Sequence, residues 1–339
     1  MLKALNYIVY LIFRAVWIWG KILPMKPVFA LARLLGNLGY YLLPGRRKIA
    51  LRNLEIAFGK DKTEAERRRI CRSSFISLCY SGAEFFFIER ITRNWEKHFT
   101  FQGDRMIDDC IRSHQAFFVF GGHLGGWMMI SMVPRRFGVS GGVVIRPQRN
   151  PYIDRFLRQL VAKYQGLMIN TRGTGKQIEK MIMQGNLIGF YMDQQSRRKQ
   201  GIPVDFFGIP AYSHIVPGYL AWKHRIPMFP FWMPRTRPGQ FTTIFRKPVE
   251  FVYSGDQEKD IQEVTRRIVK EIENTIREYP EQWLWAHNRW SRTLGGEKVS
   301  KKRRKKQIAE GVYLTSKEIL KQMDQEMSED KDEGKTGSP

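Results

Sequence analysis

Between about residue 100 and residue 245, short and continuous apolar runs alternate with segments of helical spacing. The apolar runs are Ala116–Phe120, Gly142–Ile145, Leu167–Ile169, Leu187–Met192, Met228–Trp232 and Phe241–Phe245. The segments of helical spacing are Tyr152–Gln165, Gly175–Met183 and His214–Lys223. Short apolar runs bounded by turn residues are typical of buried strands. The alternation predicts an α/β fold, with a central mixed sheet flanked by helices.

Two further stretches have the character of helices. Residues 50–87 form the first, with a helix-start pattern at Thr63, and Lys259–Glu278 form the second, which Tyr279 and Pro280 should end. The chain has 339 residues, enough for one large or two modest domains. We therefore expect a membrane-associated segment over residues 1–45, an α/β domain over residues 46–296, and a largely disordered tail of basic and then mixed charge over residues 297–339.

The amino-terminal segment is both apolar and basic. Residues 1–55 contain nine lysines and arginines but a single acid, Glu55, among many apolar and aromatic residues. This composition predicts contact with an anionic membrane surface. The apolar run from Asn6 to Gly20 is interrupted by Arg14 and followed by Lys21. It is shorter than the roughly 20 apolar residues of a typical spanning helix, so a tilted span and an interfacial anchor both remain open.

The net charge of the chain is +25, and residues 297–339 account for only +2 of it. Such a basic body attracts polyanions: nucleic acid, anionic lipid or an acidic carrier protein. The run Lys301–Lys306 suits nucleic acid or a lipid surface, but no nucleic-acid recognition motif accompanies it, so a lipid surface is favoured. The three cysteines form no CxxC pair, which argues against a disulfide framework and against a zinc site.

Polar residues follow three of the predicted strands. His123 comes after two glycines at the end of the first strand, and Asp193 and Gln194 follow the run Leu187–Met192. A histidine at this edge of a sheet is a candidate general base, and a carboxylate nearby could orient it. Arg146, followed by Asn150, could hold a phosphate. Each also has a structural alternative: a core histidine, a helix cap or loop ion pair for Asp193, and a surface ion pair for Arg146.

The order of these motifs resembles that of the bacterial lipid A biosynthesis acyltransferase family over about residues 35–293. The resemblance rests on motifs in the same order and with fitting gaps, beginning with Lys48, Arg52 to Glu55, and Glu84. The later motifs are Gly122-His123, Arg146-Pro147 with Asn150-Pro151 and Asp154, Arg172, Asp193-Gln194, Phe206-Phe207-Gly208 with Ala211, and Pro280 to Trp285 with Arg289-Trp290.

The resemblance implies an enzyme at the cytoplasmic face of the bacterial inner membrane. It would move a fatty acyl chain from acyl carrier protein, or from acyl-CoA, to a hydroxyl of a glycolipid such as a lipid A precursor. His123 would be the general base, and no metal or bound cofactor is implied. Substrate binding would fall to Arg146, Asn150, Arg172, Asp193 and Gln194.

The sequence departs from that family at Met128. The family's signature is His-x4-Asp/Glu, and Met128 stands where the acid belongs. An acid there would fix the tautomer of the histidine and stabilise its protonated form. Either Asp193 or Glu84 replaces it, a backbone carbonyl holds the ring, or the protein is a catalytically inactive lipid-binding or scaffold protein of the membrane. Because the other polar residues are intact, we favour an active enzyme.

Three tryptophans close the region of resemblance. Trp283, Trp285 and Trp290 fit two interpretations equally well, a position at the lipid interface and a packed turn of the core.

Overall fold

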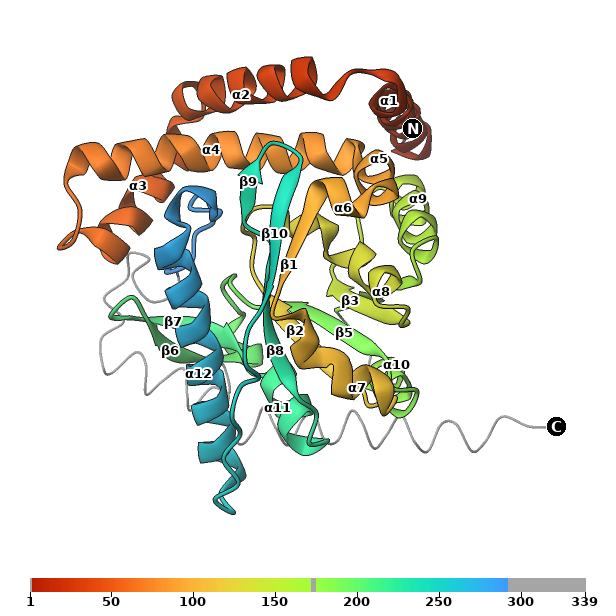
Figure 1. Cartoon of the computed structure of the whole chain (residues 1–339). Helices are drawn as coiled ribbons and strands as arrows, with labels where there is room; N and C mark the ends of the chain where they lie inside the picture. The colour runs from red at the N-terminus through yellow and green to blue at the C-terminus, as the bar shows by residue number, and fades with distance from the viewer. Residues whose placement is uncertain (1, 172–174, 292–339) are drawn as a thin grey trace.

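The computed structural model describes residues 2–171 and 175–291 of the chain, and four helices form its amino-terminal part (Figure 1). These helices are α1 (Leu2–Ile22), α2 (Met25–Leu42), α3 (Pro44–Phe58) and α4 (Glu64–Phe86). The Thr63 side chain accepts a hydrogen bond from the backbone of Glu66, and the Glu66 side chain accepts one from the backbone of Thr63. This capping box starts α4 where the sequence predicts. The predicted helix over residues 50–87 is broken between α3 and α4.

An eight-stranded mixed sheet forms the centre of the molecule, as predicted. Its strand order is β1-β10-β8-β2-β5-β3-β4, and β9 pairs with β10 at one side. The strands β8, β2, β5, β3 and β4 run parallel to one another, whereas β10 is antiparallel to β8 and parallel to β1. The bounds of the strands are β1 Phe99–Gln102, β2 Phe117–Gly121, β3 Gly141–Ile145, β4 Gly166–Asn170, β5 Leu187–Tyr191, β8 Met228–Trp232, β9 Arg235–Arg237 and β10 Gln240–Phe245.

Helices cover both faces of this sheet, which explains why its central strands are continuous apolar runs. In β2, Phe118 and Phe120 join one core cluster, and Phe117 and Val119 join the other. The first cluster includes residues of α3, α10 (Gly175–Met183), α11 (Val216–Lys223) and α12 (Gln257–Glu278). The second includes residues of α5 (Ile88–Arg93), α7 (Asp108–Arg112), α8 (Val133–Arg136) and α9 (Pro151–Ala162).

The remaining elements are short. A hairpin of β6 (Gly201–Phe206) and β7 (Ile209–His214) lies outside the main sheet, and the sequence pattern did not predict it. The segment after β2 is a 3-10 helix, η2 (Trp127–Met132). The other short helices are α6 (Trp95–His98), η1 (Asp104–Ile107), η3 (Arg198–Gln200) and η4 (Pro280–Gln282). The predicted boundary at residue 45 stays a prediction, and the predicted tail over residues 297–339 lies outside the described residues.

Candidate active site

His123 and Asp193 form a hydrogen-bonded pair at the carboxyl edge of the sheet. The Nδ1 atom of His123 lies 2.9 Å from Oδ1 of Asp193, and the backbone N–H of His123 donates to Oδ2 at 2.9 Å. Both oxygens of one carboxylate therefore contact the same residue. A carboxylate can only accept hydrogen bonds, so the proton of the neutral imidazole is on Nδ1, and Nε2 is the basic nitrogen.

Strand pairing brings the two residues together. In the parallel pair of β2 and β5, Gly121 is in register with Tyr191, and His123 and Asp193 each lie two residues beyond that pair. Gly122 makes the close approach possible. A Cβ atom at Gly122 would lie 2.7 Å from Cγ of Asp193, closer than real Cβ atoms come to other heavy atoms. Any larger residue at position 122 would push the carboxylate away from the histidine.

Asp193 is buried, with 2% of its surface exposed, and it keeps its negative charge. Burial alone would raise the pKa of this carboxyl, but the nearby His123 imidazole and the hydrogen bonds to Asp193 lower the pKa to about 2. One of these bonds comes from the indole Nε1 of Trp283, which donates to Oδ2 at 2.8 Å. Asp193 is therefore ionised at neutral pH and suited to stabilising a protonated His123.

Aromatic rings hold the imidazole of His123 in place. Its ring centroid lies 4.4 Å from that of Trp127 and 5.0 Å from that of Tyr191, and the Tyr191 hydroxyl donates to the backbone carbonyl of Trp127. The amide nitrogen of Gln194 lies 3.2 Å from Nε2 and 3.3 Å from Nδ1. These nearly equal distances place the amide beside the ring, not on one lone pair. The side chain of His123 remains 14% exposed.

The end of the described chain packs against this loop. Leu124 pairs with Trp283 in an antiparallel bridge, and the backbone N–H of Leu284 donates to the carbonyl of His123 at 3.1 Å. Trp283, Trp285 and Trp290 are buried to 2% exposure or less, so the core interpretation is correct and the interpretation as lipid-interface residues is wrong. Of the three, Trp283 also contacts the candidate site directly.

A second histidine, His287, also belongs to this region. Its Nε2 accepts a hydrogen bond from the backbone N–H of Gln195 at 3.2 Å, and its backbone carbonyl accepts one from Asn53 at 2.7 Å. Burial lowers the pKa of His287 to about 4, so this imidazole is neutral at neutral pH. Sequence reasoning missed His287 because the contact joins residues 92 positions apart along the chain.

The other predicted substrate-binding residues lie around the pair or outside it. Arg146 follows β3 at the same edge of the sheet and is exposed, and within the described ranges its guanidinium has no hydrogen bond or ion pair. Asn150 caps α9, accepting from the backbone of Tyr152, and its amide donates to the carbonyl of Asn6 in α1. Arg172 lies outside the described residues.

The two predicted replacements for the missing acid have different surroundings. Asp193 contacts His123, whereas Glu84 is 1% exposed and pairs with Arg235 at 2.6 Å through Nε and at 2.7 Å through Nη2. Arg235 also donates to the carbonyl of Gly125, in the loop that carries His123. Met128 is half-buried in the first turn of η2.

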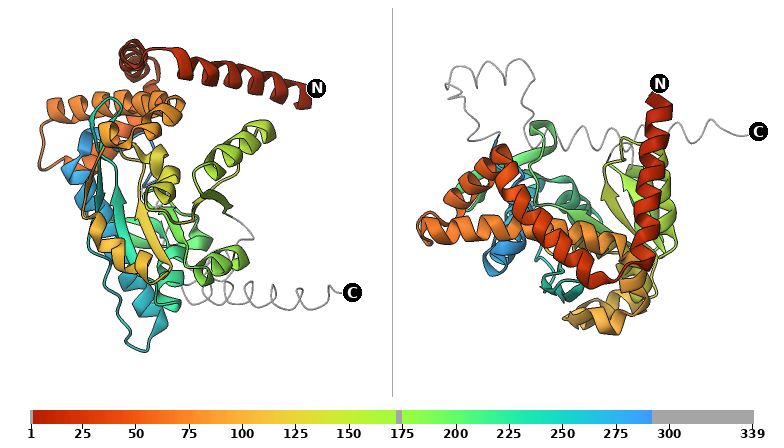
Figure 2. Two further views of the ribbon diagram at one scale, coloured as in Figure 1. Left: turned by 45° about the vertical axis from the view of Figure 1, so that its right-hand side comes forward. Right: turned by 90° about the horizontal axis from the view of Figure 1, so that it is seen from above.

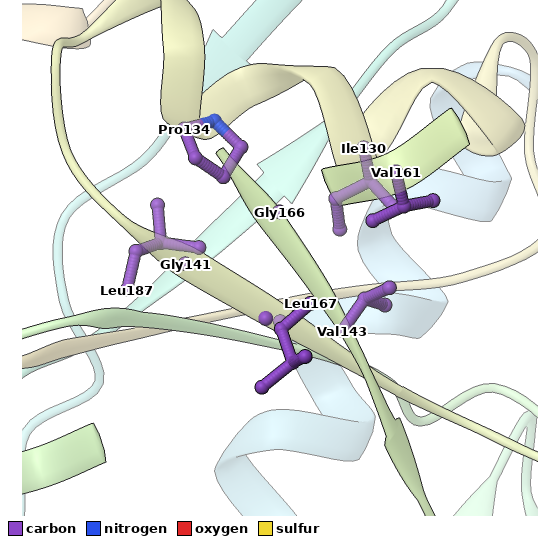
Figure 3. A pocket seen from close by; sticks show the side chains of 10 residues that line it. Ile130, Pro134, Gly141, Val143, Val161, Gly166, Leu167 and Leu187 are labelled. Carbon is purple, nitrogen blue, oxygen red and sulfur yellow. The ribbon is translucent and has the colours of Figure 1, made fainter. Parts of the chain in front are cut away.

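A small apolar pocket lies elsewhere, at the amino ends of β3, β4 and β5 (Figure 3). The residues that line it are Ile130, Pro134, Gly141, Gly142, Val143, Val161, Gly166, Leu167, Leu187 and Gly189. None of them has a polar side chain, and His123 and Asp193 follow the opposite ends of their strands. The candidate catalytic residues therefore lie at the opposite edge of the sheet from this pocket. Among the described residues, no cluster of His, Cys, Asp and Glu could hold a metal ion.

Comparison with known proteins gives the relationships of the chain. Lipid A biosynthesis lauroyltransferase of Escherichia coli (strain K12) is 25% identical over 276 residues, which cover 79% of this chain and 86% of that protein. Two proteins are 24% identical over 287 residues, covering 83% of this chain and 90% of each: lipid A biosynthesis palmitoleoyltransferase of Escherichia coli (strain K12) and lipid A biosynthesis acyltransferase of Shigella flexneri. The model of the bacterial lipid A biosynthesis acyltransferase family matches residues 1–292. The chain is an acyltransferase and belongs to the bacterial lipid A biosynthesis acyltransferase family.

Proposed function

We propose that this enzyme transfers a fatty acyl chain from a thioester donor to a hydroxyl of a glycolipid such as a lipid A precursor, with His123 as the general base. The donor in the proposal is acyl carrier protein or acyl-CoA. The names of the relatives support lipid A as the acceptor class. The observation that carries the proposal is the hydrogen bond between His123 Nδ1 and the buried Asp193 carboxylate.

In the proposed mechanism the acceptor hydroxyl attacks the thioester carbonyl while Nε2 of His123 removes its proton. The new C–O bond forms a tetrahedral oxyanion, and the imidazole becomes positively charged. Collapse of this intermediate breaks the C–S bond, and the leaving thiolate takes the proton back from His123. The products are the acyl ester and the free thiol of the donor. His123 is then neutral again, ready for the next turnover.

Asp193 is the proposed partner of His123 in place of an acid at position 128. A carboxylate that accepts from Nδ1 keeps the proton on that atom and stabilises the imidazolium during the reaction. Asp193 makes this contact, remains charged because its pKa is about 2, and is fixed by Trp283. The two oxygens of one carboxylate hold both the ring and the backbone of His123, so a second acid at Met128 is not required.

The charges of the protein suit the proposed substrates. An acidic carrier protein and a phosphorylated acceptor are both attracted to a chain of net charge +25. Arg146, exposed at the edge that carries His123, is the proposed contact for a phosphate of the acceptor. We place the enzyme at the cytoplasmic face of the bacterial inner membrane, and α1 supports membrane association because Lys3–Ile22 is long and apolar enough to be a candidate span.

The test is acyl transfer by the purified protein in detergent, with labelled acyl carrier protein thioester or acyl-CoA as the donor and lipid A precursors as acceptors. His123→Asn should abolish turnover and leave the folded structure intact. The same substitution at His114, which is exposed before β2, is the matched control and should leave turnover unchanged. Equal turnover of wild type and His123→Asn would refute the general-base role. No turnover by the wild type with any of these substrates would favour the lipid-binding scaffold.

A further inference from the structure

Helix α1 is docked on the body of the protein along its whole length. The docked residues recur with helical spacing and are Asn6, Tyr10, Phe13, Trp17 and Gly20. At one end, the carbonyl of Asn6 accepts a hydrogen bond from Asn150. In the middle, the rings of Phe13 and Trp17 lie 5.6 and 5.0 Å from that of Phe156 in α9.

The far end of α1 is held just as closely. A Cβ atom at Gly20 would lie 2.6 Å from the carbonyl oxygen of Phe86, and Lys21 pairs with Glu89 at 2.9 Å. Because both ends and the middle make contacts, α1 and the body form one unit, and α1 cannot take an orientation in the membrane that the body does not share.

The opposite face of α1 is apolar and uncovered. One strip of it consists of Leu5, Ile8, Val9, Ile12, Val16 and Trp19, which are 43% to 60% exposed. Apart from the neighbours Ile8 and Val9, these positions recur every three or four residues, and the set lies on one side of the helix. The exposed area is continuous along the helix, and an uncovered apolar surface of this kind marks an interaction site.

Helix α2 repeats the arrangement. Phe29, Ala32, Gly36 and Tyr40 are buried, and a Cβ atom at Gly36 would lie 2.5 Å from Cα of Ile76 in α4. The other face exposes a row of leucines. These are Leu31, Leu34, Leu35, Leu38 and Leu42, and four of the five are at least half exposed.

Basic residues line one flank of each helix, between the docked face and the apolar face. In α1 they are Lys3, Arg14 and Lys21, which are 11 and 7 residues apart, close to whole numbers of helical turns. In α2 they are Lys26 and Arg33, also seven residues apart. The first 54 residues contain no acid, and Lys21 stays 52% exposed although it pairs with Glu89 of α5. Apolar faces flanked by basic stripes match the chemistry of an anionic lipid leaflet.

The two helices lie across the same side of the molecule. Figure 1 shows α2 running above α4 with α1 at its end, and the view from above in Figure 2 shows α1 and α2 meeting at an angle on top of the body. The left view of Figure 2 shows α1 extending sideways above α9. Neither helix points away from the body as a perpendicular anchor would.

A perpendicular crossing by α1 would place charges in hydrocarbon. Arg14 lies near the middle of α1, and its guanidinium packs 4.9 Å from the ring of Phe156. Helix α9, which packs beside α1, carries the ion pair of Asp154 and Arg158 and would enter the bilayer with it. Charged groups at the centre of a bilayer are strongly disfavoured. An orientation in the plane of the membrane avoids this, because the basic flanks then lie at the depth of the headgroups and not in the hydrocarbon.

We propose that α1 and α2 together form a platform that lies within one leaflet of an anionic membrane and does not cross it. The inference deepens the proposed function, because it specifies the membrane association included there. The candidate site is connected to both helices of the platform. Asn150, in the loop that also carries Arg146, donates to Asn6 near the start of α1. The Ser81 hydroxyl of α4, the helix beneath α2, donates to the carbonyl of Gly125 in the loop after His123. A lipid acceptor would then reach His123 from the bilayer surface.

The test is the immersion depth of nitroxide labels on α1, measured by electron paramagnetic resonance in vesicles of phosphatidylethanolamine and phosphatidylglycerol. Labels are placed one at a time by Leu5→Cys, Ile12→Cys and Trp19→Cys, which lie seven residues apart on the exposed face. Each of these variants also carries Cys79→Ala, which removes the one partly exposed cysteine of the described residues. Cys71 and Cys110 are kept because they are buried. Lys259→Cys, on α12 and 79% exposed, is the control that should stay in water.

The platform predicts three nearly equal depths. A spanning helix instead predicts that the label at position 12 lies about 10 Å deeper than the other two, given a rise of about 1.5 Å per residue. That gradient would overturn the proposal, and so would a protein that does not bind the vesicles. Turnover of the same preparations with detergent-dispersed acceptor is measured in parallel. Turnover without vesicle binding would refute the platform alone, whereas vesicle binding with equal depths but no turnover would refute the proposed function alone.

Discussion

The carboxylate of Asp193 contacts the Nδ1 atom of His123 at 2.9 Å, although the two residues are 70 positions apart in the sequence. They meet because both extend two residues beyond the paired ends of β2 and β5. The neighbouring strand thus supplies an acid to the histidine from a direction that the local His-x4 spacing does not show. This relationship makes Met128 compatible with the enzyme that we propose.

If Asp193 is the partner of His123, an acid at position 128 adds little. We expect Met128→Glu to change kcat by less than about tenfold, equivalent to less than about 1.4 kcal/mol of barrier. The measurement is the acyl-transfer rate at saturating donor and acceptor. A rise of several orders of magnitude would show instead that the wild-type site lacks its acid. The double variant with Asp193→Asn and Met128→Glu tests whether a glutamate at position 128 can replace Asp193 as the partner of His123.

Trp283→Phe removes a buried hydrogen bond to the Asp193 carboxylate and should lower the free energy of unfolding by about 2 kcal/mol. It should also raise the pKa of Asp193. A carboxyl whose pKa is lowered by folding stabilises the protein above its unfolded value near 3.9, and this contribution is lost as the pH falls through the folded value. Acid unfolding should therefore begin at higher pH in Trp283→Phe. Trp285→Phe is the matched control, because its indole donates to Pro280 instead, and an equal shift in both variants would contradict the assignment.

Much of the fold could be predicted from sequence because its central strands are buried on both faces. Such strands are unbroken apolar runs, and the runs at β2, β3, β4, β5, β8 and β10 were all found. The hairpin of β6 and β7 is not evident from the sequence because Pro203 and Pro210 lie inside its strands, and proline argues against a strand. The close packing of the loop before η2 is also hidden from the sequence: a Cβ atom at Gly126 would lie 2.5 Å from the ring of Phe241.

The candidate site was predicted in part. His123 and Asp193 stood out because both follow apolar strands, and parallel strands bring their carboxyl ends to one edge. The sequence alone does not distinguish Asp193 from Glu84 as the acid that contacts the histidine; the structure does, because Glu84 pairs with Arg235 instead. Trp283 and His287 reach the site because the chain turns back toward it after α12. The sequence carries no local signal for that change of direction.

His287 should make stability depend on pH between about 6.5 and 4. Burial lowers the pKa of this imidazole to about 4 in the folded protein, so the unfolded chain binds more protons over that range. The free energy of unfolding should therefore fall as the pH drops from 6.5 to 4, by up to about 3 kcal/mol. His287→Gln, measured by urea unfolding across this range, should flatten the dependence. The same change at the exposed His114 should not, and an unaltered slope in His287→Gln would contradict the prediction.

Glu84 should matter for stability more than for chemistry. Glu84→Gln leaves Arg235 buried without its charge partner, which should cost about 3 to 5 kcal/mol in the free energy of unfolding. Glu89→Gln disrupts ion pairs to the exposed Lys21 and Lys163 and should cost less than about 1 kcal/mol. Urea unfolding compares the two. A large loss of kcat in Glu84→Gln with unchanged stability would identify Glu84 as a residue of the reaction.

The most direct test of the central claim is kcat for acyl transfer by Asp193→Asn. An amide cannot serve as the charged acceptor of the Nδ1 proton, so the histidine loses both its tautomer and the stabilisation of its protonated form. By analogy with the loss of the orienting aspartate in a Ser-His-Asp triad, kcat should fall by about 10⁴. Asp205→Asn, exposed near the end of β6, is the matched control and should keep full activity. A folded Asp193→Asn variant with kcat within about tenfold of the wild type would contradict the account.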